Sequence, residues 1–184
     1  MRYRLLLFLF LICFCFCLKT QAEADGFLAD SVPYKSRRAK SIYIEALGSS
    51  IFGLSINYDT RFKPGNSGWG IRAGICQILR EGRFTSYSFP ILVNKVNSEK
   101  RASFEYGAGM VITYRRWWYD NPDNSISHYH GTYYGPTANV GFRFQPLKMG
   151  PTWRIYWSPV WRIGQPLKTV NLLWFGTSLG LGFH

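Results

Sequence analysis

The stretch "SHYH" contains the residue types that metal binding or nucleophilic chemistry would need. Residues two apart on a β-strand share a face, so His128 and His130 could both ligate one metal ion. Ser127 beside a histidine would be the pair for ester hydrolysis. Asp120 and Asp123 supply further ligand types in the same segment, and no catalytic motif surrounds it. We interpret the stretch as a polar external loop and predict no catalytic residue, no metal site and no cofactor.

A second set of residues combines carboxylates with guanidinium groups. These side chains recur on the polar side of alternating stretches, with three acids and four arginines among them. Charge-assisted hydrogen bonds between such groups would link them into a network. An anion path lined by the surplus arginines is the alternative. The predicted ion-pair network comprises Glu45, Asp59, Arg61, Arg72, Glu105, Arg143 and Arg154.

The elements that must position these residues are β-strands. In "TWRIYWSPVWRI", Trp153, Trp157 and Trp161 take one side, and Arg154 and Arg162 take the other. This is the period of a strand. Turn-type segments separate similar runs, and no helical period follows the first 24 residues. The eight predicted strands are residues 41–48, 52–62, 69–79, 85–96, 102–115, 132–145, 152–163 and 172–183.

The N-terminus has the features of a secretory signal peptide. Arg2 and Arg4 precede an apolar run at residues 5–18, and Ala22-Glu23-Ala24 is a small-residue cleavage pattern. An uncleaved helix and a lipoprotein anchored through a cysteine of the run are the alternatives. The predicted organisation is a signal peptide at 1–24, a flexible periplasmic lead-in at 25–40 and one domain at 41–184.

Charge and cysteine content narrow the function classes. The 184-residue chain has a formal net charge of +12. For an exported protein the expected counter-charges are lipid headgroups and lipopolysaccharide phosphates rather than nucleic acid. Removal of the signal peptide leaves Cys76 as the only cysteine, which excludes an intrachain disulfide and a cysteine-rich metal cluster. We interpret Cys76 as a small inward residue of the third strand.

The apolar side of the strands carries aromatic residues at both ends. Alternation alone would also fit a soluble sandwich or a lipocalin-like barrel. Here, pairs of aromatic residues lie eight positions apart, which covers about 20 Å of membrane thickness in a tilted strand. The polar side holds arginines, acids and glycines, and the lysines lie in the lead-in, at turns or at strand ends. We therefore predict that lipid contacts the apolar side. The predicted aromatic girdle is Tyr106, Tyr114, Tyr134, Phe142, Trp153, Trp161, Phe175 and Phe183.

The connections between the strands fit one orientation. With the N-terminus in the periplasm, residues 63–68, 97–101 and 145–151 form short inner turns, and residues 116–131 form the longest outer loop.

The segment "RRWWYDNPDN" begins that outer loop. Its arginines and tryptophans could bind a sugar or a lipid phosphate. We favour the interpretation that Trp117, Trp118 and Tyr119 continue the outer aromatic belt into the loop.

With these features, residues 42–184 resemble the small eight-stranded outer-membrane β-barrels of Gram-negative bacteria, the OmpX-like proteins and the OmpA transmembrane domain. The resemblance implies that the barrel-assembly machinery reads the last strand through Leu179, Leu181 and Phe183. His184 departs from the family rule, because the aromatic residue is here penultimate.

The predicted fold is all-β, a closed eight-stranded antiparallel transmembrane barrel in an up-and-down meander. An interior of this size is filled by side chains, so we expect a sealed barrel in the bacterial outer membrane, in contact with lipid and lipopolysaccharide. The expected role is non-enzymatic, structural or interacting through external loops. A lipid-modifying acyl hydrolase or transferase and a soluble exported lipid-binding barrel are the alternatives. The sequence leaves the oligomeric state open.

Overall fold

The computed structural model describes residues 36–50, 53–81, 84–120, 126–161, 170–171 and 174–184. The predicted signal peptide and residues 25–35 of the predicted lead-in lie outside this range. Within it, the last part of the lead-in is ordered. The Ala39 amide donates a hydrogen bond to the Gly65 carbonyl at 3.2 Å, and Lys40 already begins the first strand.

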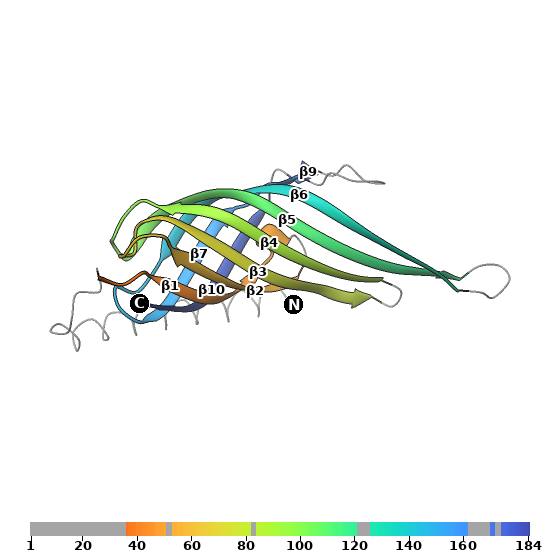
Figure 1. Ribbon diagram of the computed structural model, residues 1–184, viewed down its shortest axis with the longest axis horizontal. Helices are drawn as coiled ribbons and strands as arrows, with labels where there is room; N and C mark the ends of the chain where they lie inside the picture. Colours follow the sequence, from red (N-terminus) through yellow and green to blue (C-terminus); the bar gives the residue numbers. More distant parts are fainter. Residues whose placement is uncertain (1–35, 51–52, 82–83, 121–125, 162–169, 172–173) are drawn as a thin grey trace, which may run out of the picture.

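Antiparallel strands follow one another around a closed ring (Figure 1). The described strands are β1 (Lys40–Ala46), β2 (Leu54–Arg61), β3 (Gly68–Glu81), β4 (Phe84–Val96), β5 (Ala102–Asp120), β6 (Ile126–Phe144), β7 (Gly150–Trp157), β8 (Val160–Trp161), β9 (Val170–Asn171) and β10 (Phe175–Phe183). Strands β1 to β6 each pair with the next in sequence, β8 pairs with β6 and β9, and the first strand also pairs with the last, Lys40 lying opposite Phe183.

The closed wall has eight strand positions in the described chain. Strands β7 and β8 together fill one position, and β9 and β10 together fill another. The predicted closed eight-stranded antiparallel barrel is therefore confirmed.

The seventh predicted strand is not continuous. Ser158 and Pro159 separate β7 from β8, because proline has no amide hydrogen to donate to a ladder. The Pro159 carbonyl keeps the segment attached to β6 by accepting hydrogen bonds from the Thr137 hydroxyl at 3.0 Å and the Ala138 amide at 3.4 Å.

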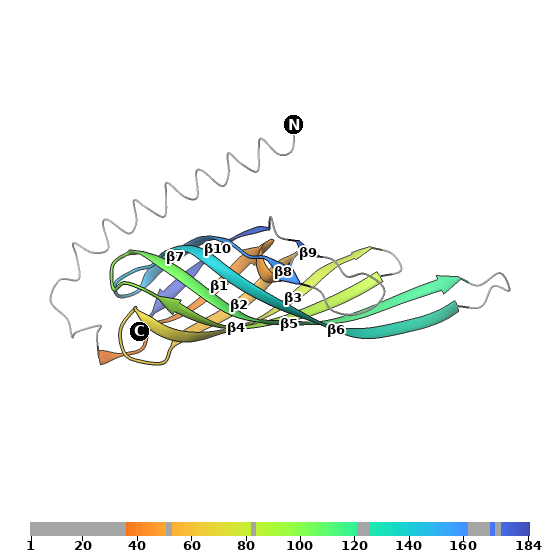
Figure 2. The same ribbon diagram turned by 90° about the horizontal axis from the view of Figure 1, so that it is seen from above.

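The predicted loop at 116–131 is mostly a β-hairpin. Strands β5 and β6 stay paired from Ala102 opposite Phe144 to Asp120 opposite Ile126, and they project well beyond the short strands at one end of the barrel (Figures 1 and 2). We call the projecting part, residues 114–120 and 126–132, the arm. The prediction of a loop was wrong because the arm carries polar and aromatic residues on both faces, which removes the apolar–polar alternation.

The two ends of the barrel therefore differ. The start of β1, the C-terminus and the connections at 62–67, 97–101 and 145–149 lie at one end, which we call the terminus end. The arm and the β3–β4 hairpin lie at the opposite end, which we call the arm end (Figure 2). The predicted grouping of the three short turns matches this arrangement.

A short 3-10 turn, η2 (Gly48–Ser50), connects β1 to β2 and fills the lumen on the arm-end side. Ser49 is fully buried there. The turn is held by the Trp174 indole, which donates to the Gly48 carbonyl at 2.8 Å. Leu47 enters the turn with a φ of 69°, which is costly for a residue with a side chain. No helix in the described ranges is long and apolar enough to cross a membrane.

Glycines on the inner face make room for two tyrosines. Gly180 lies opposite Tyr43, and a Cβ added to Gly180 would come within 2.3 Å of the Tyr43 Cβ. Gly141 lies opposite Tyr156 with a corresponding approach of 2.5 Å. The inward glycines predicted from the sequence thus allow large side chains of neighbouring strands to cross a narrow interior.

We expect Gly180→Ala to destabilise the barrel by roughly 1–3 kcal/mol, the usual cost of overpacking. Urea titration of the refolded protein, followed by heat-modifiable gel mobility, measures this loss. Gly131→Ala is the matched control, because the nearest atom to its new Cβ is the Tyr133 hydroxyl at 3.2 Å, the far end of a long side chain. Equal stability of the two variants would contradict the packing role of Gly180.

Candidate functional site

The largest polar cluster in the lumen is built around Asp59 and Glu105. Arg143 bridges the two carboxylates, with its Nη2 2.7 Å from Asp59 Oδ2 and its Nε 2.6 Å from Glu105 Oε2. Arg154 reaches the same two residues at 3.4 Å each, and Arg61 pairs with Asp59 from the same strand. Three guanidinium groups from β2, β6 and β7 therefore share two carboxylates from β2 and β5.

Asn94 also belongs to this cluster, and the sequence analysis did not identify this residue. The Asn94 amide group donates to Asp59 Oδ2 and to Glu105 Oε1, at 2.7 Å in both cases, and its oxygen accepts a hydrogen bond from Arg61 at 2.8 Å. Asn94 was missed because an amide carries no charge, although its place on the inward parity of β4 could have been used to find it.

A second ion pair lies beside η2. Arg72 pairs with Glu45, and its Nη2 also donates to the Ser49 hydroxyl at 3.0 Å. The Glu45 carboxylate accepts a hydrogen bond from the Ser49 amide at 3.0 Å. The seven predicted charged residues thus come together as two clusters, of five and two members, and not as one set of direct ion pairs.

Tyr43 lies between the two clusters. Its ring centroid is 3.8 Å from the Arg154 guanidinium carbon and 5.7 Å from that of Arg72. Tyr156 lies 5.7 Å from Arg72 in the same way. Because a cation is attracted to the face of an aromatic ring, Tyr43 connects the clusters without an ion pair.

The charged side chains of both clusters are buried. Arg61, Arg72 and Arg154 expose 1% of their surface or less, and they are among the largest fully buried residues described. The outside of the barrel shows the reverse, with Ile44, Ile56 and Leu54 exposed by 54%, 59% and 65%. The described barrel is apolar outside and polar inside, which is the arrangement of membrane-spanning barrels.

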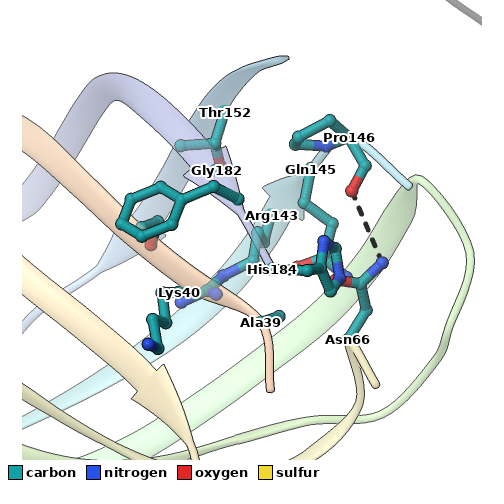
Figure 3. Close-up of a pocket in the computed structure, with 11 residues that line it drawn as sticks. Ala39, Lys40, Asn66, Arg143, Gln145, Pro146, Thr152, Gly182 and His184 are labelled. Carbon is teal, nitrogen blue, oxygen red and sulfur yellow. Dashed lines mark hydrogen bonds between the residues drawn. The ribbon is translucent and has the colours of Figure 1, made fainter. Parts of the chain in front are cut away.

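At the terminus end of the barrel, hydrogen bonds connect the three short turns to one another. Glu99 accepts hydrogen bonds from the backbone amides of Asn66 at 2.8 Å and Ser67 at 3.0 Å. The Asn66 side chain donates to the Pro146 carbonyl at 3.4 Å, as Figure 3 shows. A shallow pocket lies beside them, with Lys40, Arg143 and Gln145 in its lining.

The C-terminal residue belongs to this cluster of turns. The His184 Nδ1 donates to the Lys148 carbonyl at 2.7 Å, and its Nε2 lies 3.0 Å from Asn66 Oδ1. The departure from a terminal aromatic residue thus places a polar side chain across two turns. Leu179 and Leu181 are exposed on the outer face, and Phe183 is half-buried at the end of β10. Their role as an assembly signal stays a prediction.

All members of the predicted girdle fall on the outer face or at its ends. Tyr114, Tyr134, Phe142, Trp161 and Phe175 are exposed, and Tyr106, Trp153 and Phe183 are half-buried.

Near the terminus end the outer rings form a row. Tyr106 lies 6.3 Å from Trp69 and 6.2 Å from Phe104, and Phe104 lies 5.7 Å from Phe142. Phe104 was missed because it is the third residue of its strand and fell outside the eight-residue spacing. The row is a continuous aromatic band across β3, β5 and β6.

The arm contains the residues first considered for chemistry. His128 and His130 lie on one face of β6, and Ser127 lies on the other face, because neighbouring strand residues point to opposite sides. Across the ladder, the His128 ring contacts the Trp118 ring at 6.2 Å. In the described chain, no group of three or more His, Cys, Asp or Glu side chains could hold a metal ion. Cys76 is buried on the inner face.

No protein-family model and no curated protein matches the chain. Among solved structures, it is similar to the N-terminal β-barrel domain of Pseudomonas aeruginosa OprF, with 8% identity, 81% of this chain and 97% of that chain covered, and a TM-score of 0.45. It is also similar to Neisserial surface protein A, with 12% identity, 79% and 93% coverage, and a TM-score of 0.44. We assign the fold of this chain from its own closed strand order.

We expect Glu105→Gln to destabilise the barrel by about 3–5 kcal/mol, because Arg143 and Arg154 would lose one of the two carboxylates that they share. Urea unfolding of protein refolded into lipid vesicles gives the measurement. Arg143→Gln should cost clearly less in the Glu105→Gln background than alone, with a coupling of roughly 0.5–3 kcal/mol.

The Glu45→Gln substitution is the control for this cycle, because Glu45 belongs to the other ion pair. Its effect should add to that of Glu105→Gln within about 0.5 kcal/mol. Simple additivity of Glu105→Gln and Arg143→Gln would show that the cluster is not an energetic unit.

Proposed function

We propose that the protein is a non-enzymatic barrel of the bacterial outer membrane, with a sealed lumen and a structural or surface-interaction role carried by its arm. The single observation that carries the proposal is the burial of the lumen arginines. Arg61, Arg72 and Arg154 each expose 1% of their surface or less. An aqueous path past these side chains would leave guanidinium surface open to water. Their burial instead favours a plug over an anion path.

The outer surface supports the membrane location. A buried set of arginines and acids with exposed isoleucines would be unstable in water, because apolar surface would remain hydrated while charges were desolvated. If hydrocarbon surrounds the barrel, the cost of hydrating the exposed isoleucines disappears. The aromatic row at the terminus end lies where an interfacial belt is expected. Lipid is therefore the surrounding that best fits both faces.

The two ends suggest how the role is divided. The terminus end has short turns fastened by Glu99 and His184, which leaves little surface to adapt to a partner. The arm has exposed side chains on both faces, including Tyr129 at 51%. A surface-interaction role would therefore fall on the arm, outside the membrane.

Recording in planar bilayers tests the sealed lumen. The wild-type barrel should give no stable single-channel steps. A Glu45→Ser/Arg72→Ser variant removes both members of the pair beside η2, so that no unpaired charge is left buried, and it should also stay closed, because the cluster around Asp59 and Glu105 still fills the lumen. Stable wild-type conductance with anion selectivity would replace the plug by the anion path.

Substitution on the outer face tests the membrane location. Ile56→Arg places a charge in the middle of β2 and should cost about 2–4 kcal/mol in a bilayer, whereas Phe62→Arg, just beyond the strand at the terminus end, should cost about 0–1 kcal/mol. Vesicle refolding with urea titration measures both variants. A water-facing Ile56 would tolerate arginine within about 0.5 kcal/mol, and that result would contradict the proposal.

A further inference from the structure

The outer face of the barrel changes character where β5 and β6 enter the arm. On β5 the outward residues from Ala102 to Tyr114 are apolar or aromatic, and Tyr114 and its partner Tyr87 on β4 are exposed by 38% and 37%. The next outward residue on β5 is Arg116, which is exposed and lies opposite His130 on β6. A cationic side chain and an imidazole thus follow the last aromatic residues of the lipid-facing surface.

Ring contacts hold this surface in place. The Arg116 guanidinium carbon lies 5.8 Å from the Trp118 ring centroid. The Trp118 ring meets His128 edge to face at 6.2 Å, and Tyr114 contacts His130 at 6.5 Å. We call this surface, formed by Tyr114, Arg116, Trp118, His128 and His130, the outer arm face. It is a paired β-ladder throughout, so its donors are fixed relative to one another.

The height of the outer arm face corresponds to the headgroup layer. Tyr114 belongs to the aromatic belt, which lies at the membrane interface. Two residues along a strand rise about 6.6 Å, and a tilt near 40° reduces this to about 5 Å along the membrane normal. Arg116 therefore stands about 5 Å beyond Tyr114, where lipid phosphates lie, and Trp118 about 5 Å further, beside headgroup sugars.

The charge of the arm fits an anionic occupant. The outer arm face carries one arginine and two histidines and no acidic residue, and the acid of the arm, Asp120, lies at its far end opposite Ile126. Arginine recognises phosphate through paired N–H donors, and a phosphate monoester carries nearly two negative charges, more than the diester of a phospholipid. The aromatic rings beside Arg116 offer apolar faces next to its guanidinium.

We propose that the outer arm face is a binding site for a phosphorylated glycolipid of the outer leaflet, with the phosphate monoester of lipid A on Arg116 and His130, and the sugar against Trp118 and His128. The site rests on the proposed function, because its height is defined by a barrel inserted in the outer membrane with the arm outside.

The test uses the mature full-length barrel in detergent micelles, with bound lipid measured by native mass spectrometry. Bisphosphorylated lipid A should bind, and Arg116→Gln should weaken its binding by about tenfold, the loss expected for one charge-assisted contact. Lys100→Gln is the matched control, because it removes the same charge at an exposed turn of the terminus end. Dephosphorylated lipid A should bind weakly and equally to wild type and Arg116→Gln.

Equal lipid A affinities of Arg116→Gln and Lys100→Gln would overturn the proposal, as would phosphatidylglycerol binding as tightly as lipid A, which would assign the face to phospholipid. Heat-modifiable mobility and protease protection in vesicles are measured on the same samples. A barrel that inserts but does not prefer lipid A contradicts only this site, whereas a chain that never inserts contradicts the membrane barrel and the site together.

Discussion

Every buried arginine in this barrel must find a carboxylate, and that requirement organises the interior. A guanidinium group removed from water costs several kcal/mol unless charge-assisted hydrogen bonds replace its hydration. Arg143 meets the requirement by bridging Asp59 and Glu105, and Arg72 meets it through Glu45. Because these partners come from different strands, the ion pairs also depend on the strand register. A slip of one residue would turn each charge toward lipid.

The same constraint explains the inner glycines and the internal turn. A lumen that holds four arginine side chains has little space left for tyrosine, so Tyr43 lies opposite Gly180 and Tyr156 opposite Gly141. The η2 turn fills the remaining space beside Arg72 and supplies the Ser49 hydroxyl as an extra acceptor. Ion pairing and packing thus involve the same residues, and a change in one disturbs the other.

The period of two was enough to predict the strands, the inward face and the charged residues on it. It could not predict which charges meet, because Asp59 and Arg143 are joined across the lumen and that distance depends on strand tilt and stagger. The division into two clusters and the role of Asn94 were therefore not foreseen. The arm was missed for a different reason. Neither face of a hairpin outside the membrane contacts lipid, so its residues need not alternate between apolar and polar. The segments "RRWWYD" and "SHYHG" therefore resemble loop sequences.

The strands of the wall differ greatly in length. Strands β5 and β6 have 19 residues each, while β1 has 7, so the additional pairs lie beyond the part of the wall that a membrane needs. The seven charged residues of the two lumen clusters all lie outside those pairs, and the barrel would close without them. Their ladder nevertheless continues unbroken to Asp120 opposite Ile126. A rigid projection with exposed arginine, histidine and tryptophan is a costly way to connect two strands, and it becomes reasonable once these side chains bind something at the membrane surface.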